Sequence, residues 1–274
     1  MKKIIEFKYV TRKKITINEF LLSKGYSDNN IYYLISNENV IVDGNKIGSK
    51  NFMLEGKCNI VVILLDEKAT IPATDKEIEI LYEDKYLLAV NKKENLDVEP
   101  TINNYNQTLA NYVLAYFNKN EIYSNIHLIN RLDKLTSGIV LIAKNQYIHN
   151  LFKNVKISKK YQALVEGKTP KKGNIKIRIS KDENSIKRVV DENGKKCETK
   201  YKLIQFDGKN SLVDIELVTG RTHQIRLSFA SINHPLVGDS LYNPNYQEKD
   251  TMYLKAYEVS FVHPILKKKI KIKC

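Results

Sequence analysis

The sequence predicts an α+β protein: a mixed, largely antiparallel central sheet with flanking helices, preceded by a small α+β domain. Apolar stretches of strand length recur from residue 77 onward, and only occasional helical patterns interrupt them. Sheets with few helices argue for α+β and against a doubly wound nucleotide-binding fold. The chain contains neither a G-x-G-x-x-G sequence nor a P-loop, so dinucleotide and nucleoside triphosphate chemistry is not expected.

Residues 1–68 are expected to form the small domain. Its elements, in order, are amphipathic helices beginning at residues 15 and 29, a hairpin over residues 40–47 and a closing strand over residues 59–64. Asp43 and Gly44 indicate the hairpin, because this pair tolerates the positive φ angles of a tight turn.

This succession resembles the small RNA-binding domain first known from a small-subunit ribosomal protein, the "S-four" domain, over residues 10–65. The resemblance implies that the domain binds RNA. A capping unit without RNA contacts is the alternative, because its 11 basic and 8 acidic residues give a net charge of only +3.

Residues 69–76 are expected to be a linker, since they include Pro72 and have no apolar periodicity. A second, larger domain is expected over residues 77–274. Its expected strands lie at residues 78–81, 86–90, 139–143, 161–165 and 212–217, and its helices at residues 108–117 and 147–155. The basic, polar stretch 171–196 is expected to form strands and turns.

Charge and cysteine usage limit the class of protein. The 274 residues carry a formal net charge of +14, which predicts RNA or DNA as partner, although a genome biased to A and T would also enrich lysine. No run of about 18 apolar residues and no signal peptide occurs, so we expect a cytoplasmic protein without membrane contact. Cys58, Cys197 and Cys274 are scattered and the His residues dispersed, so no disulfide and no metal is expected.

Residues 131–144 are the most informative stretch of the larger domain. Asp133 lies two residues after Arg131, and a small polar turn at residues 136–138 leads into the apolar strand at 139–143. A buried strand holds the preceding loop rigidly, which a catalytic carboxylate requires. Taken alone, Asp133 is more simply explained as a residue that caps its turn by accepting backbone N–H bonds.

Three further segments accompany this one. Residues 159–167 read KKYQALVEG, residues 219–226 read TGRTHQIR and residues 234–239 read HPLVGD. Together with RLDKLTSGIVLIAK at 131–144, they resemble the motifs of RluA-type pseudouridine synthases in the same order, over about residues 77–274. The resemblance implies isomerisation of a uridine already in RNA without a cofactor: the N-glycosidic bond breaks, the base rotates and a carbon–carbon bond forms.

The resemblance also implies a catalytic set of Asp133, Tyr161 and Arg221. Asp133 would attack at the sugar as nucleophile or general base, and Arg221 would favour its ionised form; a phosphate clamp is the alternative for Arg221. Tyr161 would stack on the target base, unless it is an ordinary core residue. Arg131 would occupy the space left by a flipped nucleotide, or else form only a surface ion pair.

The remaining residues implied in substrate binding are His223, Gln224, Arg226 and Leu254. His223 and Gln224 would organise the Arg221 loop by hydrogen bonds. Leu254 would supply an apolar wall of the pocket or belong to the core.

The chain departs from the family pattern in three segments. Asn130 stands where many members have His, Lys93 and Asn95 replace the Pro and Gly of K-P-x-G-L, and Lys255 stands where a late L-H-A segment usually has His. None of these changes removes Asp133 or Tyr161, so they bear on substrate identity more than on activity.

Two classes of function stay open. An RNA pseudouridine synthase is the leading hypothesis, with ribosomal RNA favoured over transfer RNA because of the N-terminal domain. A non-catalytic RNA-binding or ribosome-assembly factor is the alternative, and the intact set of Asp133, Tyr161 and Arg221 argues against it. A glycosidase is disfavoured because no second acidic residue accompanies the motifs. Nothing suggests an obligate interface, so a monomer is expected.

Overall fold

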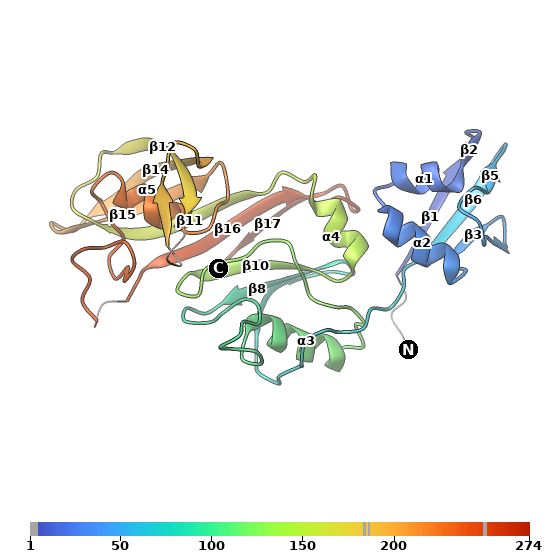
Figure 1. Ribbon diagram of the computed structural model, residues 1–274, viewed down its shortest axis with the longest axis horizontal. Helices are drawn as coiled ribbons and strands as arrows, with labels where there is room; N and C mark the ends of the chain where they lie inside the picture. Colours follow the sequence, from blue (N-terminus) through green and yellow to red (C-terminus); the bar gives the residue numbers. More distant parts are fainter. Residues whose placement is uncertain (1–4, 183–184, 186, 249–250) are drawn as a thin grey trace.

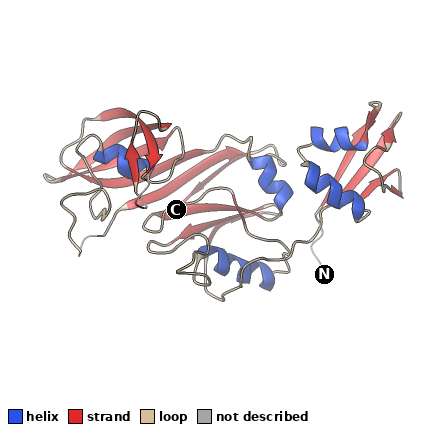
Figure 2. Ribbon diagram, in the orientation of Figure 1, coloured by secondary structure: helices blue, strands red, loops and turns tan. Residues whose placement is uncertain are grey.

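The computed structural model describes residues 5–182, 185, 187–248 and 251–274. A small N-terminal unit lies at one end, and a large sheet runs through the rest of the molecule with α3 (Leu109–Lys119), α4 (Gln146–Phe152) and α5 (Gln224–Ala230) beside it (Figure 1). Strands predominate over helices (Figure 2), and the predicted α+β class is confirmed. In the part of the chain described, every helix is too short or too polar to span a bilayer.

The N-terminal unit combines two helices, a four-stranded sheet and one short strand pair. Its elements are β1 (Glu6–Thr11), β2 (Ile15–Thr16), α1 (Ile17–Ser23), α2 (Asp28–Ser36), β3 (Val40–Val42), β4 (Asn45–Lys46), β5 (Met53–Leu54) and β6 (Cys58–Ile63). The sheet has the order β1-β6-β3-β4, and β2 pairs with β5. Helix α1 begins at Thr16, whose hydroxyl accepts from the backbone N–H of Glu19 while the Glu19 carboxylate accepts from that of Thr16, a capping box.

The expected hairpin is confirmed at its turn. Asp43 and Gly44 join β3 to β4 with φ angles of 46° and 87°, and Asp43 also accepts from the backbone N–H of Asn59 on β6 at 2.9 Å. Both expected helices occur within two residues of their expected starts. Strand β1 was not expected; its residues alternate between exposed and half-buried along the edge of the sheet.

The large sheet has eleven strands. They are β7 (Glu79–Glu83), β8 (Leu87–Lys92), β9 (His127–Leu128), β10 (Ser137–Ala143), β11 (Ser158–Glu166), β12 (Lys172–Lys181), β13 (Arg188–Val190), β14 (Lys195–Phe206), β15 (Asn210–Leu217), β16 (Leu254–Val262) and β17 (Lys269–Lys273). The main path runs β13-β12-β14-β15-β11-β16-β10-β8-β7. Only the β10–β16 pair is parallel among the pairs described, so the sheet is mixed and largely antiparallel, as predicted.

Strand β10 is apolar because both of its faces are buried. Ile139 and Leu141 join one core, whereas Val140 and Ile142 join another that includes residues of α3 and α5. A strand covered on two sides needs apolar residues at successive positions rather than in alternation. This double burial fixes the strand that follows the loop carrying Asp133.

Gly138 lets β10 approach β16 closely at that loop. Its φ angle is 113°, and a Cβ atom there would lie 2.2 Å from the carbonyl oxygen of Ala256. No other residue type fits that position without displacing the β16 backbone. The glycine of the motif therefore sets the distance between two strands next to the site.

The first core continues from the N-terminal unit into the large sheet. Tyr26 stacks on Tyr147 of α4 with ring centroids 3.9 Å apart. The Tyr147 hydroxyl donates to the carbonyl of Lys24 at 3.0 Å, and the Tyr9 hydroxyl lies within hydrogen-bond distance of both other tyrosines. Both Tyr26 and Tyr147 are buried. The two parts of the chain are thus packed together and not merely tethered.

Candidate active site

One cavity of about 530 Å³ brings together the residues expected to carry the chemistry. Asp133, Tyr161 and Arg221 all line it, although they come from three distant segments. The further lining residues used below are Glu99, Asn130, Arg131 and Lys134. His223, Gln224, Arg226 and Leu254 are not among the residues that line it, and each lies behind its wall or in the core.

Asp133 sits in a tight loop between β9 and β10. Its carbonyl accepts from the backbone N–H of Thr136 at 3.0 Å. Buried Asn130 anchors the start of the loop: its amide donates to the carbonyl of Ile139 at 3.1 Å and accepts from the N–H of Leu141 at 2.8 Å. Asn130, one of the three departures from the family pattern, therefore ties the loop to β10 through both ends of its amide.

Lys92, at the end of β8, holds the other side of this loop. Its side chain is completely buried, and the ammonium donates to the carbonyls of Lys93 at 2.9 Å, Leu96 at 2.8 Å and Lys134 at 2.9 Å. Burial lowers the pKa of Lys92 to about 8, against the opposing charge of Asp133. Sequence reasoning gave Lys92 no role; the available signal was a lysine closing an otherwise apolar strand.

Tyr161 forms part of the cavity wall from β11. The pairing with β16 shifts register between Lys160 and Tyr161, which places Tyr161 opposite Ala256. The side chain is 6% exposed, and burial, reinforced by the charge of Asp133, raises the pKa of Tyr161 above its usual value. The phenol is therefore protonated at neutral pH. Leu254 faces Ala163 on the same strand pair and lies in the core.

The loop before α5 carries Arg221 and is organised by Gln224. The Gln224 side-chain oxygen accepts from the backbone N–H of Arg221 at 3.1 Å and from the hydroxyl of Thr219 at 2.9 Å. Its nitrogen donates to the carbonyl of Glu198 at 3.1 Å and to the hydroxyl of Thr199 at 3.0 Å. These bonds agree with the role expected of Gln224 in holding the Arg221 loop.

Two expected residues have other partners. Arg226 is 3% exposed, and its guanidinium donates two bonds to the buried carboxylate of Asp239, at 2.7 and 2.5 Å. His223 lies 4.0 Å from Asp133 (Nε2 to Oδ2), whereas no ion pair joins Arg221 to Asp133 among the described residues. Among the described residues, His223 is thus the basic side chain recorded within 4.0 Å of the carboxylate, and Arg221 lines the same cavity without forming an ion pair with Asp133.

Arg131 lies at the rim of the cavity. Its guanidinium pairs with Glu99 at 2.7 Å, and its side chain is 67% exposed. Exposed ion pairs of this kind contribute about 0–1 kcal/mol. The pair therefore contributes little to the stability of the fold and leaves Arg131 at the cavity rim.

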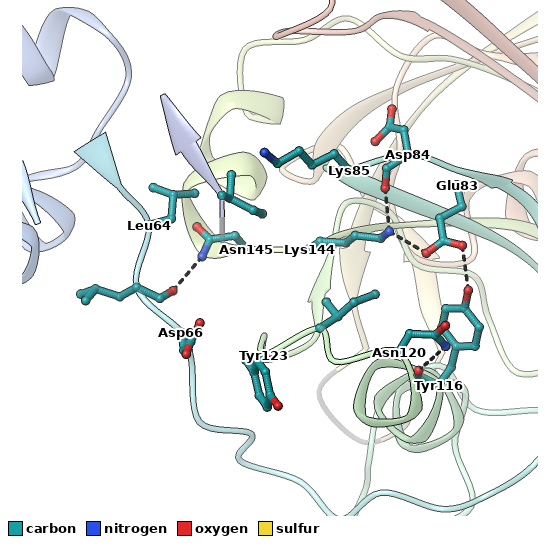
Figure 3. Close-up of a pocket in the computed structure, with 13 residues that line it drawn as sticks. Leu64, Asp66, Glu83, Asp84, Lys85, Tyr116, Asn120, Tyr123, Lys144 and Asn145 are labelled. Atoms are coloured by element: carbon teal, nitrogen blue, oxygen red, sulfur yellow. Dashed lines mark hydrogen bonds and ion pairs between the residues drawn. The ribbon is translucent and has the colours of Figure 1, made fainter. Parts of the chain in front are cut away.

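A second cavity, of about 740 Å³, lies at the junction with the N-terminal unit and contains none of the expected site residues (Figure 3). Lys144, which ends the motif at 131–144, points into it and pairs with Glu83 at 2.6 Å while donating to the carbonyl of Asp84 at 2.6 Å. Asn145 donates to the carbonyl of Leu65 at 3.3 Å. These contacts tie the end of β10 to the β7–β8 turn and to the end of the N-terminal unit.

Among the residues that the structure describes, no group of three or more His, Cys, Asp or Glu side chains is placed to hold a metal ion. The groups that line the cavity are a carboxylate, a buried phenol and several cations, and the cavity is open to solvent. The cations can bind a polyanion, and the carboxylate can reach a ring that is bound in the cavity.

Comparison with known proteins identifies the family. The RNA pseudouridylate synthase family model matches residues 86–231. The uncharacterized RNA pseudouridine synthase YjbO of Bacillus subtilis is 31% identical over 231 residues, which cover 82% of each chain. Ribosomal large subunit pseudouridine synthase D of Neisseria meningitidis serogroup A is 32% identical over 259 residues, 87% of this chain and 69% of that one.

A solved structure supports the same fold. Human RNA Pseudouridylate Synthase Domain Containing 1 superposes with a TM-score of 0.61 at 22% identity, covering 74% of this chain and 85% of the human chain. The matched residues 86–231 include Asp133, Tyr161 and Arg221. The chain belongs to the RNA pseudouridylate synthase family and is an isomerase that acts on RNA.

Proposed function

We propose that this enzyme isomerises specific uridines in large-subunit ribosomal RNA, with Asp133 as its catalytic carboxylate. The observation that carries the proposal is the single cavity in which Asp133, Tyr161 and Arg221 meet from three separate segments of the chain. A non-catalytic RNA-binding factor on the same scaffold would have no need to hold a carboxylate loop from both sides, as Lys92 and Asn130 do here.

Asp133 attacks at the sugar of the target uridine as nucleophile or general base. The N-glycosidic bond breaks, the uracil rotates, and C5 bonds to the sugar carbon while its hydrogen leaves as a proton. No cofactor enters this sequence. Tyr161 stacks on the uracil through a ring that burial keeps uncharged, and such stacking contributes about 1–3 kcal/mol per base.

The target nucleotide must leave its helix to reach Asp133. Arg131 exchanges Glu99 for an RNA phosphate and occupies the space that the nucleotide leaves. Arg221, which has no ion-pair partner within 4.0 Å in the described part of the chain, contacts the flipped nucleotide or the carboxylate once RNA is bound. Gln224 holds that loop in place.

We propose that residues 1–68 form an S-four-like RNA-binding domain, that residues 69–76 link it to the rest, and that residues 77–274 form the catalytic domain. Relatives named ribosomal large subunit pseudouridine synthase D favour ribosomal RNA over transfer RNA. An enzyme of ribosomal RNA acts where ribosomes are assembled, so we place it in the cytoplasm. We also expect it to be a monomer.

The Asp133→Asn variant tests the catalytic assignment. Using RNA that carries uridine tritiated at C5, we expect tritium release by the wild-type enzyme and none by the variant, because the amide cannot attack the sugar. RNA affinity should stay nearly unchanged. Asp191→Asn, the same substitution in the β13–β14 turn, serves as control and should release tritium normally. Undiminished release by Asp133→Asn would refute the assignment.

The RNA substrate is tested by mapping pseudouridines in total RNA from a strain that lacks the gene. We expect sites in large-subunit ribosomal RNA to disappear and to return with the wild-type gene but not with Asp133→Asn. Loss of sites only in transfer RNA would contradict the proposed substrate.

A further inference from the structure

His223 occupies an unusual place between the catalytic loop and the core behind it. It precedes α5 in a left-handed conformation, with φ 56°, and its side chain makes no capping bond to the helix. Its imidazole is 11% exposed and turns Nε2 toward Asp133 Oδ2, 4.0 Å away. A strained backbone at a buried imidazole beside a reactive carboxylate indicates a positional requirement.

The hydrogen bonds around Tyr242 determine which ring nitrogen of His223 carries the proton. The Tyr242 hydroxyl oxygen accepts from the backbone N–H of Arg188 at 2.7 Å. Its own proton is then free to be donated to His223 Nδ1, 2.9 Å away, and no other acceptor is recorded for it among the described residues. This arrangement favours Nδ1 as the acceptor, so we assign the hydrogen of the neutral imidazole to Nε2.

Several groups around the ring decide its charge. Burial lowers the pKa of His223, and the cations of Arg226 and Arg188 act in the same direction, whereas the carboxylates of Asp133 and Asp239 oppose them. The imidazole is thus neutral at neutral pH. Arg226 itself is bound to Asp239 and lies over the Tyr242 ring, 5.2 Å from its centroid. These contacts hold in place the Tyr242 ring whose hydroxyl bonds to His223.

We propose that His223 is the positioning residue of Asp133: with its hydrogen on Nε2, it donates to Oδ2 of the carboxylate when RNA occupies the cavity. The present separation of 4.0 Å is too long for a hydrogen bond, and bonds at catalytic groups commonly shorten when substrate is bound. A neutral donor orients the carboxylate and stabilises its ionised form without adding a charge.

This inference rests on the proposed role of Asp133, and two substitutions at His223 test it. The side-chain nitrogen of Gln can replace Nε2–H, whereas the shorter Asn replaces only Nδ1 and tolerates the left-handed backbone better. In tritium-release assays we expect His223→Asn to lower kcat by about 10- to 100-fold, the range in which supporting bonds of reactive groups fall, with KM nearly unchanged. His223→Gln should recover most of the rate despite its less favourable backbone.

The pH profile separates positioning from a merely structural role. Loss of a donor to the ionised carboxylate should move the acidic limb of kcat to higher pH in His223→Asn. Tyr242→Phe removes the hydroxyl that favours one tautomer of His223. We expect this variant to move the acidic limb of kcat to higher pH as well, but by a smaller amount. Tyr246→Phe, the same deletion on the same loop at a partly exposed ring, is the control and should match wild type.

Two results would overturn the inference. One is an unchanged kcat and pH profile in His223→Asn; the other is an equal loss in the Asn and Gln variants together with weaker RNA binding, which would make His223 an RNA contact. Activity of Asp133→Asn would instead defeat the proposed function, whatever the His223 variants do.

Discussion

At the scale of single residues, the site depends on buried polar groups that hold the loop of Asp133 in place. Asp133 is one of 31 acidic residues in the sequence and is only partly exposed. What distinguishes it is a loop held by Lys92 from one side and by Asn130 from the other. The motif at residues 131–144 predicted a catalytic role for Asp133, and the structure places Asp133 in the wall of a cavity. It could not predict Lys92 as the holder of that loop, because the contact joins Lys92 to Lys134 across two strands of the sheet.

Lys92→Met tests how much the three hydrogen bonds of the Lys92 ammonium contribute to holding this loop. The substitution keeps the length of the side chain but leaves three carbonyls without their donor, so we expect a free energy of unfolding lower by about 2–4 kcal/mol and a reduced kcat. Because the pKa of Lys92 is about 8, raising the pH through that value discharges the wild-type ammonium and removes one of its three donors.

The wild-type rate should therefore fall as the pH rises through about 8, and the slower Lys92→Met enzyme should lack that alkaline limb. Urea denaturation and tritium release against pH measure the two effects. Lys93→Met, on the adjacent exposed residue, should match wild type in both. A wild-type rate that is flat up to pH 10 would contradict the claim that deprotonation of Lys92 lowers the rate.

At the scale of secondary-structure elements, a carboxylate within the turn fixes the connection between β7 and β8. In the β7–β8 turn, Asp84 accepts from the backbone N–H groups of Tyr86 at 2.7 Å and Leu87 at 2.8 Å. Its other oxygen accepts from the Tyr82 hydroxyl at 2.6 Å and lies 3.4 Å from the fully buried His263. Burial opposes ionisation, yet these partners together lower the pKa of Asp84 to about 2.

The sign of the resulting pH effect follows from that lowered pKa. A carboxylate that binds protons less readily when folded contributes stability above its unfolded pKa and loses it as the pH falls through the folded value. We expect Asp84→Asn to lower the free energy of unfolding by about 2 kcal/mol at pH 7, with the gap narrowing between pH 4 and pH 2. Urea denaturation at each pH gives the measurement. Asp75→Asn, at an exposed ion pair with Lys119, should change stability by less than about 0.5 kcal/mol.

Elements with a local signal were predicted, and those defined by distant partners were not. The apolar run at 139–143 gave β10, and Asp43 with Gly44 gave the hairpin, because burial and positive φ angles restrict the residue types allowed. Helix α5 was missed: it is seven residues long and begins after a left-handed His223, without a capping side chain. Strand β1 was also missed: its alternation covers only the six residues Glu6–Thr11, and it is stabilised by pairing with the distant β6.

At the scale of the whole molecule, the N-terminal unit and the large sheet share one hydrophobic core. Residues of α1, α2 and β6 belong to the same buried cluster as residues of β10 and α4. The sequence indicated a linker between two domains, but no local pattern reveals that Tyr26 stacks on Tyr147, 121 positions later. The shared core fixes the position of the N-terminal unit relative to the large sheet that carries the site.

Tyr147→Ala tests whether this junction couples the two parts. The substitution removes a buried ring that stacks on Tyr26 and a hydroxyl that bonds to Lys24, with an expected cost of about 3–5 kcal/mol. Because that cost falls on the junction, calorimetry should show one unfolding transition for wild type and two for the variant, the first belonging to the N-terminal unit. Tyr33→Ala, at an exposed ring of α2, should retain a single transition. Two transitions already present in wild type would mean that the N-terminal unit folds independently, and its position relative to Asp133 would then be set by RNA and not by the protein.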